Sequence, residues 1–268
     1  MKSDYYLKSF PQTRIATIDM FPEAIKKHYI SALLEFDVTE SRVKLKELRK
    51  AGVHISFNAW IIKVIGAVLA KHPEATGYLY KKRKIIIFNS ISISILVEKK
   101  ISGQKVPVPA LIQNVDIKTA SEISREIEWA KSRDISAEEA VINRPSSLAE
   151  KIYYHLPGFL RRIFWRILLS LPELAYKKMG NAVVTSIGMM GKINGWFIHR
   201  SVHPVSFGIG SVLKKPVVIK EEIKIREILN MTILVDHDVI DGAPMVRLLN
   251  DLTKSLEKGD YITTNKFE

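Results

Sequence analysis

One helix constrains the fold of this chain more than any other feature. Apolar side chains recur at the i, i+3, i+4, i+7 spacing of an α-helix, at Phe57, Trp60, Ile61, Val64, Ile65, Val68 and Leu69. Ser56 precedes them and is expected to cap the helix, while His72 and Pro73 are expected to end it. The pattern predicts a helix that lies on a hydrophobic core.

The sequence on either side of this helix alternates between strand and helix patterns. We predict a strand over 29–38, with Thr39 as the N-cap of a helix over 40–50, and two strands over 84–88 and 90–98. Residues 102–114 contain two prolines, which suit an edge or irregular strand, and 117–134 return to a helical pattern. The last third predicts strands within 181–191, 203–218 and 228–239, followed by a helix with Pro244 in its first turn. We expect an α/β fold, with residues 1–268 forming a single domain.

The composition limits the chemistry. The 41 Lys and Arg exceed the 28 Asp and Glu, and a net charge of +13 favours anionic partners such as a phosphorylated cofactor, an acidic carrier or a membrane surface. The basic residues are not interleaved with aromatic residues, so nucleic acid is not favoured. Because the chain has no cysteine, it cannot form disulfides, thiolate metal sites or an acyl thioester on itself. No signal-type segment or 18-residue apolar run is present, so we expect a cytoplasmic location.

Residues 146–180 contain a basic amphipathic helix. Three arginines lie opposite an apolar stripe formed by Leu160, Ile163, Phe164, Ile167, Leu168 and Leu171. In one interpretation the stripe packs on its own domain or on a sister subunit. In the other, residues 159–171 dock on a partner or a membrane surface, which they are too short and too charged to cross.

The segment LVDHDVIDGAP, residues 234–244, carries the candidate chemistry. His237 follows a predicted buried strand, and its imidazole can take a proton from a thiol or hydroxyl and return it later. Asp241 can orient that ring, and Gly242 allows a tight turn. His199 and His203 have i, i+4 spacing, but Arg200 stands where a zinc protease has glutamate, so we predict no metal site. The remaining histidines are interpreted as structural or surface residues, at positions His28, His54, His72 and His155.

The segment DHDVIDGAPMVRLL resembles the signature of the catalytic core of dihydrolipoyl acyltransferases from 2-oxoacid dehydrogenase complexes. Other segments agree in the same order, namely FDVTESRVKLKELRK, ISFNAWIIKVIGAVLAKHPEATG, GQKVPVPALIQN, VVTSIGMMG and VSFGIGSVLKKPVV. The resemblance spans roughly residues 10–257. It implies the chloramphenicol acetyltransferase-like fold, a two-layer sandwich with a mixed sheet, and homotrimers with active sites at the subunit interfaces.

The resemblance also implies roles for individual residues. His237 would be the general base, and Asp241 would be the orienting carboxylate of the motif. In related proteins this carboxylate pairs with an arginine near the N-terminus, for which Arg14 is the nearest candidate. Thr185 takes the position of the hydroxyl that stabilises the oxyanion, with Ser186 beside it. The acyl group would pass directly between coenzyme A and a bound acceptor in a ternary complex, which requires no cysteine.

Two departures from the family pattern affect the expected function. Asp238 follows the catalytic histidine where those enzymes usually have arginine, so the operating pH or the acceptor is expected to differ. We expect neither the lipoyl domain nor the subunit-binding segment of those enzymes here, so any lipoyl group would arrive on another chain. The leading hypothesis is an acyltransferase that uses acyl-CoA and dihydrolipoamide, or a small alcohol or amine, without a metal. The alternative is a non-catalytic trimeric scaffold that binds a partner or membrane through the basic helix.

Overall fold

The structure is a computed structural model that describes residues 4–8, 10, 13–81, 83–101, 104–132, 148–187, 191 and 193–262. Parts of four predicted segments, at 102–103, 133–134, 146–147 and 188–190, lie outside these residues. The helices are α1 (Thr13–Ala24), α2 (Thr39–Lys50), α3 (Phe57–Lys71), α4 (Ala120–Ser132), α5 (Leu148–His155), α6 (Gly158–Ser170), α7 (Pro172–Met179) and α8 (Gly242–Lys258), with a short 3-10 helix at Pro73–Thr76. The strands are β1 (Tyr29–Asp37), β2 (Tyr78–Tyr80), β3 (Lys84–Ile86), β4 (Ile93–Ile101), β5 (Gln104–Ile112), β6 (Ala182–Ser186), β7 (Val205–Ile219) and β8 (Glu222–Asp236).

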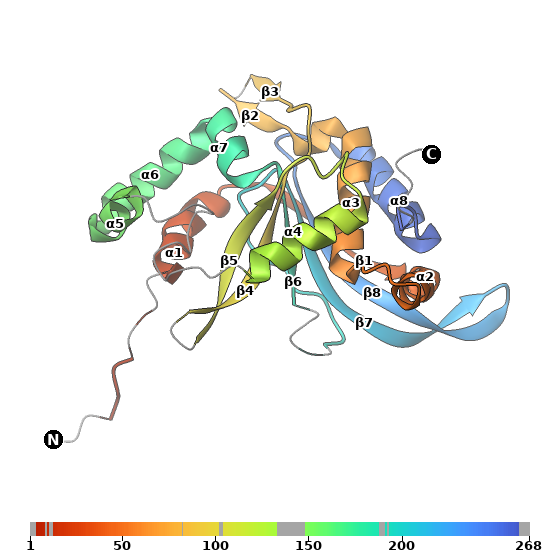
Figure 1. Cartoon of the computed structure of the whole chain (residues 1–268). Coiled ribbons are helices and arrows are strands. Elements are labelled where there is room, and N and C mark those ends of the chain that lie inside the picture. Colours follow the sequence, from red (N-terminus) through yellow and green to blue (C-terminus); the bar gives the residue numbers. More distant parts are fainter. Residues whose placement is uncertain are drawn as a thin grey trace.

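Six strands form one mixed sheet in the order β1-β8-β7-β6-β4-β5 (Figure 1). The β6 strand runs parallel to both β4 and β7, and the other neighbouring strands are antiparallel. The two prolines of β5 lie in an edge strand, as predicted, because proline cannot donate a backbone hydrogen bond to a further strand. The architecture confirms the predicted α/β class with a mixed sheet.

Helices α2, α3, α4 and α8 cover one face of this sheet (Figure 1). The α3 helix lies at the centre of this layer, and every residue from Ala59 to Leu69 is buried. The side chain of Ser56 accepts a hydrogen bond from the backbone N–H of Ala59 at 3.2 Å, so the predicted cap is confirmed. Trp60 is fully buried, and its indole N–H donates to the carbonyl of Asp260 at 2.8 Å. The prediction that this helix lies on the core is therefore confirmed.

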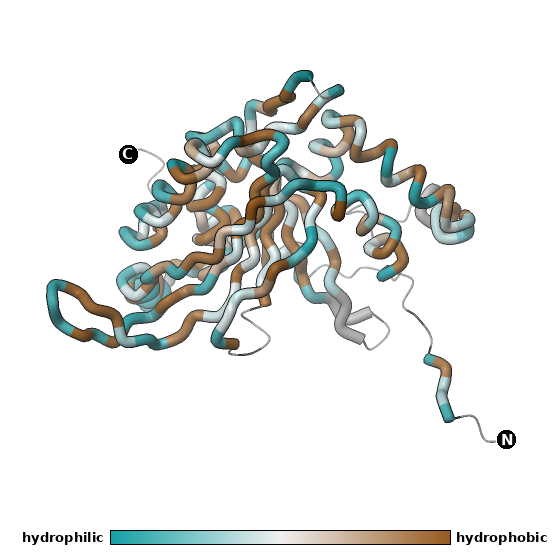
Figure 2. Tube along the Cα trace, turned by 180° about the vertical axis from the view of Figure 1, so that it is seen from behind, coloured by the Kyte–Doolittle hydropathy of each residue, from teal (hydrophilic) through white to brown (hydrophobic). Residues whose placement is uncertain are grey.

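The segment 193–204, which precedes β7 in the sequence, crosses the opposite face of the sheet. The indole N–H of Trp196 donates to the carbonyl of Leu34 in β1 at 3.0 Å, and the amide of Asn230 in β8 donates to the carbonyl of Gly195 at 3.2 Å. Close packing explains a glycine at position 208, because a Cβ there would lie 2.9 Å from Nδ1 of His199. Beyond this layer, the β7–β8 hairpin projects from the body of the molecule (Figure 2).

One predicted cap is wrong. The α2 helix begins at Thr39 itself, and its N-cap residue is Val38. The Thr39 hydroxyl donates to the carboxylate of Asp37 at 2.6 Å and accepts from the backbone N–H of Glu227 at 2.8 Å. This hydroxyl therefore joins the start of the helix to β8 and does not satisfy the helix N–H groups.

The segment 146–180, predicted to contain a basic amphipathic helix, holds the three helices α5, α6 and α7 in its described part, and α6 contains the three arginines. Contacts join α6 to α1 and to α7, and these helices lie together at one side of the sheet (Figure 1). Among the described residues, no helix has both the length and the apolar character needed to span a bilayer.

Candidate active site

The turn that carries His237 is fixed to two neighbouring elements through its backbone. The N–H of Asp236 donates to the carbonyl of Pro204 at 3.0 Å, and the N–H of His237 donates to the carbonyl of His28 at 2.9 Å. The carbonyl of Asp236 accepts from Val239 at 3.1 Å and from Ile240 at 3.3 Å, which closes the turn before α8. His237 is therefore held at a defined position, immediately after the buried strand β8.

A buried ion pair lies directly before this turn. The Asp236 side chain is fully buried, and its Oδ2 lies 2.5 Å from Nζ of Lys27, which precedes β1. Its Oδ1 accepts a hydrogen bond from the backbone N–H of Asp238 at 3.3 Å. Because a buried carboxylate is costly without a counter-charge, Lys27 is the residue that stabilises Asp236 in this position.

The side chain of His237 is half exposed, and that of Asp241 is almost fully exposed. Nδ1 of His237 lies 3.9 Å from Oδ1 of Asp241, which is beyond hydrogen-bond distance. Asp241 is the N-cap residue of α8, and Gly242 begins that helix. The backbone of Gly242 is not left-handed, and a Cβ there would meet no atom within 4 Å. The backbone of a single chain therefore does not require glycine at this position.

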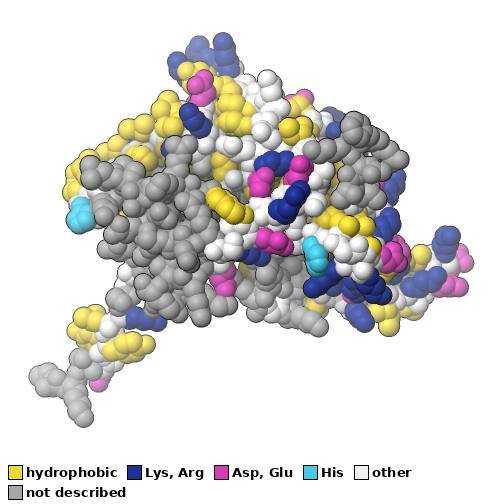
Figure 3. Space-filling view, viewed as in Figure 1, with side chains coloured by type: hydrophobic (Ala, Val, Ile, Leu, Met, Phe, Trp, Pro, Cys, Tyr) yellow, Lys and Arg dark blue, Asp and Glu magenta, His cyan; other side chains and the backbone are white. Residues whose placement is uncertain are grey.

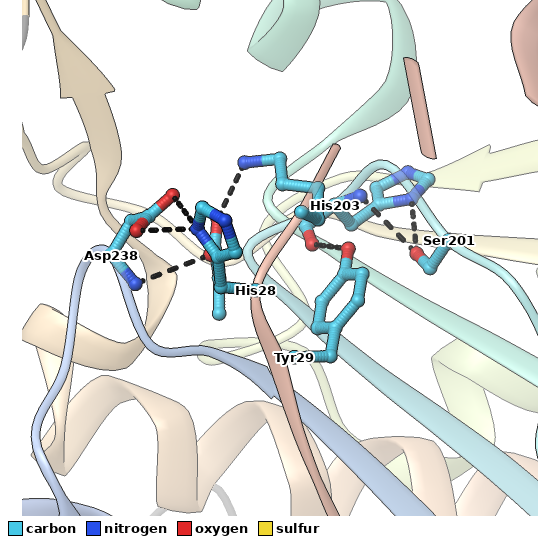
Figure 4. Close-up of polar contacts among 7 residues, drawn as sticks. His28, Tyr29, Ser201, His203 and Asp238 are labelled. Atoms are coloured by element: carbon cyan, nitrogen blue, oxygen red, sulfur yellow. Dashed lines mark hydrogen bonds and ion pairs between the residues drawn. The ribbon is translucent and has the colours of Figure 1, made fainter. Parts of the chain in front are cut away.

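The side chain of Asp238 contacts His28. Its Oδ1 lies 2.9 Å from Nδ1 of His28, immediately before β1 (Figure 4). Both side chains are at least one third exposed. The sequence analysis interpreted His28 as a structural or surface residue, and no local pattern could place it beside Asp238, 210 positions away.

Buried polar groups lie beside this turn. The hydroxyl of Tyr29 donates to the carbonyl of His203 at 2.5 Å (Figure 4). Nε2 of His203 lies 3.1 Å from the carbonyl of Met179. Burial lowers the pKa of His203 to about 4, so its ring is neutral at neutral pH. Burial likewise raises the pKa of Tyr29 far above its usual range. These groups connect the start of β1 to the segment that precedes β7.

Thr185 and Ser186, the two candidates for the oxyanion donor, lie on opposite faces of the sheet. Thr185 is paired with Gly208, and a Cβ atom at position 208 would point at His199. Ser186 is paired with Ile209, which belongs to the core under the helices. Because directly paired residues share a face, Thr185 lies on the face that residues 193–204 cross.

Polar side chains accompany Thr185 on that face. Ser206 is hydrogen-bonded to Nε2 of His199, and Thr232 lies in the same cross-strand row as Thr185. Among the residues that the structure describes, the buried atoms Nδ1 of His199, Oδ1 of Asn230 and Oγ1 of Thr232 have no hydrogen-bond partner. Burial lowers the pKa of His199 to about 4, so its ring is neutral. Unpaired buried polar atoms favour binding of water or a polar ligand, which distinguishes this face from the apolar face of Ser186.

His237 and Thr185 are not brought together within one chain. Thr185 in β6 lies in the same cross-strand row as Thr232 in β8, and β7 separates the two strands. His237 lies five residues after Thr232, just beyond the end of β8. With about 3.4 Å per residue and about 4.8 Å per strand spacing, His237 and Thr185 are separated by about 20 Å. A single reacting carbonyl cannot touch both of them in one chain.

Arg14 and Asp241 are also not brought together. The Arg14 guanidinium lies over the ring of Phe10, 5.2 Å from its centroid. Among the described residues, the ion pairs of Asp241 include His237 but not Arg14. The proposed pairing of Arg14 with Asp241 stays a prediction. Within the same described part of the chain, no cluster of three His, Asp or Glu side chains could hold a metal ion.

Comparison with known proteins identifies the family. The family model described as 2-oxoacid dehydrogenases acyltransferase (catalytic domain) matches residues 24–139 and 175–263. A dihydrolipoyllysine-residue succinyltransferase component of the 2-oxoglutarate dehydrogenase complex from Buchnera aphidicola is 23% identical over 209 residues, which are 78% of this chain and 41% of that protein. A dihydrolipoyllysine-residue acetyltransferase component of the pyruvate dehydrogenase complex from Bacillus subtilis is 24% identical, over 87% of this chain and 46% of that protein. The chain thus spans about half the length of these relatives.

Solved structures share the fold. A probable dihydrolipoamide acetyltransferase from Listeria monocytogenes superposes over the whole of both chains, with a TM-score of 0.70 and 19% identity. The dihydrolipoamide acetyltransferase of Azotobacter vinelandii gives a TM-score of 0.67 with 18% identity, over 95% of this chain and 93% of that chain. Chloramphenicol acetyltransferase gives a TM-score of 0.50 with 12% identity, over 98% of this chain and 100% of that chain, so the predicted fold is confirmed. With its fold and most of its length matched, the chain belongs to the family of 2-oxoacid dehydrogenase acyltransferase catalytic domains.

Proposed function

We propose that this protein transfers an acyl group between coenzyme A and a small acceptor, with His237 as the general base. The observation that carries the proposal is the placement of His237. Its backbone is fixed between β8 and the residue that precedes β1, while half of its side chain faces solvent. Nδ1 faces Asp241, so Nε2 is the nitrogen available to an acceptor.

Acyl exchange needs a proton acceptor and a donor to the oxyanion. Nε2 of His237 takes the proton of the acceptor thiol or hydroxyl, and the freed electron pair attacks the carbonyl carbon of the acyl thioester. The carbonyl oxygen becomes an oxyanion, to which the Thr185 hydroxyl donates a hydrogen bond. The intermediate then releases the thiolate of coenzyme A, which takes the proton from His237. No covalent intermediate with the protein is required.

The names of the relatives support a thiol acceptor. They are a dihydrolipoyllysine-residue succinyltransferase and a dihydrolipoyllysine-residue acetyltransferase, so dihydrolipoamide is the first acceptor to test, before small alcohols and amines. The study of the Azotobacter enzyme names one serine, one histidine and one asparagine in its mechanism, the last two four positions apart. His237 and Asp241 have this spacing here. The net charge of +13 favours binding of the phosphates of coenzyme A.

The separation of His237 and Thr185 supports an active site shared between two chains. Because about 20 Å lies between them in one chain, His237 of one subunit must meet Thr185 of a neighbour for both to act on one carbonyl. A homotrimer with cyclic symmetry provides three such sites. The position of Thr185 beside unpaired buried polar atoms favours it over Ser186 as the oxyanion donor.

Thiol release from a panel of acyl-CoA thioesters, with dihydrolipoamide, alcohols and amines as acceptors, tests the proposal. We expect acceptor-dependent turnover that His237→Ala abolishes. The control is His54→Ala, which replaces an exposed histidine in the loop before α3 and should leave turnover unchanged. If the folded, trimeric protein shows no turnover with any pair in the panel, the proposal is wrong and a non-catalytic scaffold is favoured.

A further inference from the structure

The helix α6 turns one charged side chain, that of Arg161, toward the protein. Nε of Arg161 lies 2.6 Å from Oδ2 of Asp19 in α1, and that carboxylate is almost fully buried. The hydroxyl of Tyr153 in α5 donates to the same oxygen at 2.9 Å, and the indole of Trp165 donates to Tyr153 at 2.9 Å. This network fixes the rotation of α6 about its axis.

The opposite side of α6 is apolar and faces solvent. Its residues, here named the apolar stripe, are between 38% and 57% exposed and comprise Phe159, Leu160, Ile163, Phe164, Ile167 and Leu171. Of the apolar residues that the sequence pattern assigned to this side, only Leu168 is buried. Hydrophobic side chains gather along the upper left edge of the molecule, where Figure 1 places α6 (Figure 3). An exposed apolar surface of this kind marks an interaction site.

The surroundings of the stripe are basic. Residues 13–27 and 152–178 together contain eight Lys and Arg and three Asp and Glu. Arg162 is exposed, and among the described residues it forms no ion pair. Arg166 is 69% exposed, and its Nε lies 3.5 Å from Oε1 of Glu23. Lys26 contacts the same carboxylate oxygen more closely, at 2.7 Å, so the charge of Arg166 is only weakly paired. Two copies of this surface would repel each other, so the charge favours an anionic partner over a second copy of the chain.

We propose that the apolar stripe docks this protein on the surface of an anionic lipid bilayer. Large apolar residues along one side of a helix, with arginines beside them, are the pattern of helices that lie in the plane of the membrane interface. The 13 residues of α6 extend about 20 Å, which is too short to cross the hydrocarbon core, so the helix lies on the bilayer. Its fixed rotation presents the stripe before any lipid is bound.

The docking surface is separate from the acyltransferase machinery. The family model matches neither residues 140–174 nor the chain before residue 24, so α6 and almost all of α1 lie outside the matched regions. His237 and Thr185 lie within those regions. The proposal therefore does not depend on acyl transfer, and a loss of docking should leave turnover in solution unchanged.

Flotation of the intact chain with vesicles tests the proposal. We expect binding to vesicles that contain phosphatidylglycerol and weaker binding to vesicles of phosphatidylcholine alone, with salt reducing the difference. Replacing two half-exposed residues of the stripe, with Ile163→Ser and Ile167→Ser together, should weaken binding at least about tenfold, since both lose apolar area that enters the interface. The control is Ile117→Ser, in the turn before α4, because Ile117 is 74% exposed but distant in sequence from the stripe.

Three results would overturn the proposal. The first is no binding to either kind of vesicle by protein that is folded. The second is equal loss of binding in the stripe variant and in Ile117→Ser, which would show that the stripe has no special part. The third is a smaller oligomer in the stripe variant without any vesicle binding by the intact protein, which would assign the stripe to contacts between copies.

Discussion

The ion pair between Lys27 and Asp236 predicts a strong and asymmetric effect of mutation on stability. Replacing Lys27 with Met leaves a fully buried carboxylate whose side-chain hydrogen bonds, among the described residues, are reduced to one backbone N–H at 3.3 Å. Breaking a buried pair in this way typically costs about 3–5 kcal/mol, and we expect about 3 because water can reach the partly exposed position of Lys27. Asp236→Asn removes the buried charge, and the lysine that remains can turn toward solvent. Asp236→Asn should therefore lower the free energy of unfolding by less than Lys27→Met does, by about 1–2 kcal/mol.

A double-mutant cycle measures the coupling between the two residues. The double variant contains no unpaired buried charge, so its cost should be about 1–2 kcal/mol less than the sum of the single variants. Urea unfolding followed by circular dichroism at a fixed protein concentration gives these values. The matched control is Lys26→Met, because Lys26 is 55% exposed, pairs with Glu23 at the surface and should contribute less than about 1 kcal/mol. Additive effects, or a cost for Lys27→Met no larger than that for Lys26→Met, would refute the reasoning.

Three further predictions follow from single positions. His203→Gln should reduce the loss of stability in acid, because the buried ring has a pKa of about 4 but takes up a proton near 6.5 when unfolded. From pH 7 to pH 5 the free energy of unfolding in urea should therefore fall by roughly 2 kcal/mol more in the parent protein, where His199 also contributes, than in the variant. An equal fall in the variant would contradict this. Gly180→Ala should destabilise the protein by about 1–3 kcal/mol, because φ is +73° and a Cβ would lie 2.3 Å from the carbonyl oxygen of Ser92; the control Gly195→Ala, where a Cβ meets no atom, should leave the midpoint unchanged. Asp238→Asn weakens only an exposed contact with His28, so a change in unfolding free energy above about 1 kcal/mol would be unexpected.

Local patterns predicted the elements of the fold because the forces that form them are local. The Ser56 cap depends on an N–H three residues away, and the position of β5 at the sheet edge follows from Pro107 and Pro109. The helical period also identified the apolar stripe of α6. It could not show that Asp19, more than 140 positions away, would pair with Arg161 and turn the stripe outward.

The sequence predicted which residues belong to the candidate site, but not how these residues are placed relative to one another. The motif placed His237 at the end of a strand, which the structure shows. The separation of Thr185 from His237 follows from the strand order β8-β7-β6, which no motif specifies. Pairing of His28 with Asp238 likewise depends on the antiparallel register of β1 and β8, and therefore on tertiary structure.

Mixed assembly of two inactive variants tests most directly whether one active site is built from two chains. Each of His237→Ala and Thr185→Val should be nearly inactive alone, since removal of an oxyanion donor typically lowers kcat about 100- to 1,000-fold. When equal amounts are unfolded together and reassembled at random into trimers, each site receives an intact His237 from one chain and an intact Thr185 from the next in about one quarter of cases. We therefore predict recovery of about one quarter of the parent turnover per site in the mixture. Mixed trimers that form but remain as inactive as the separate variants would contradict the account.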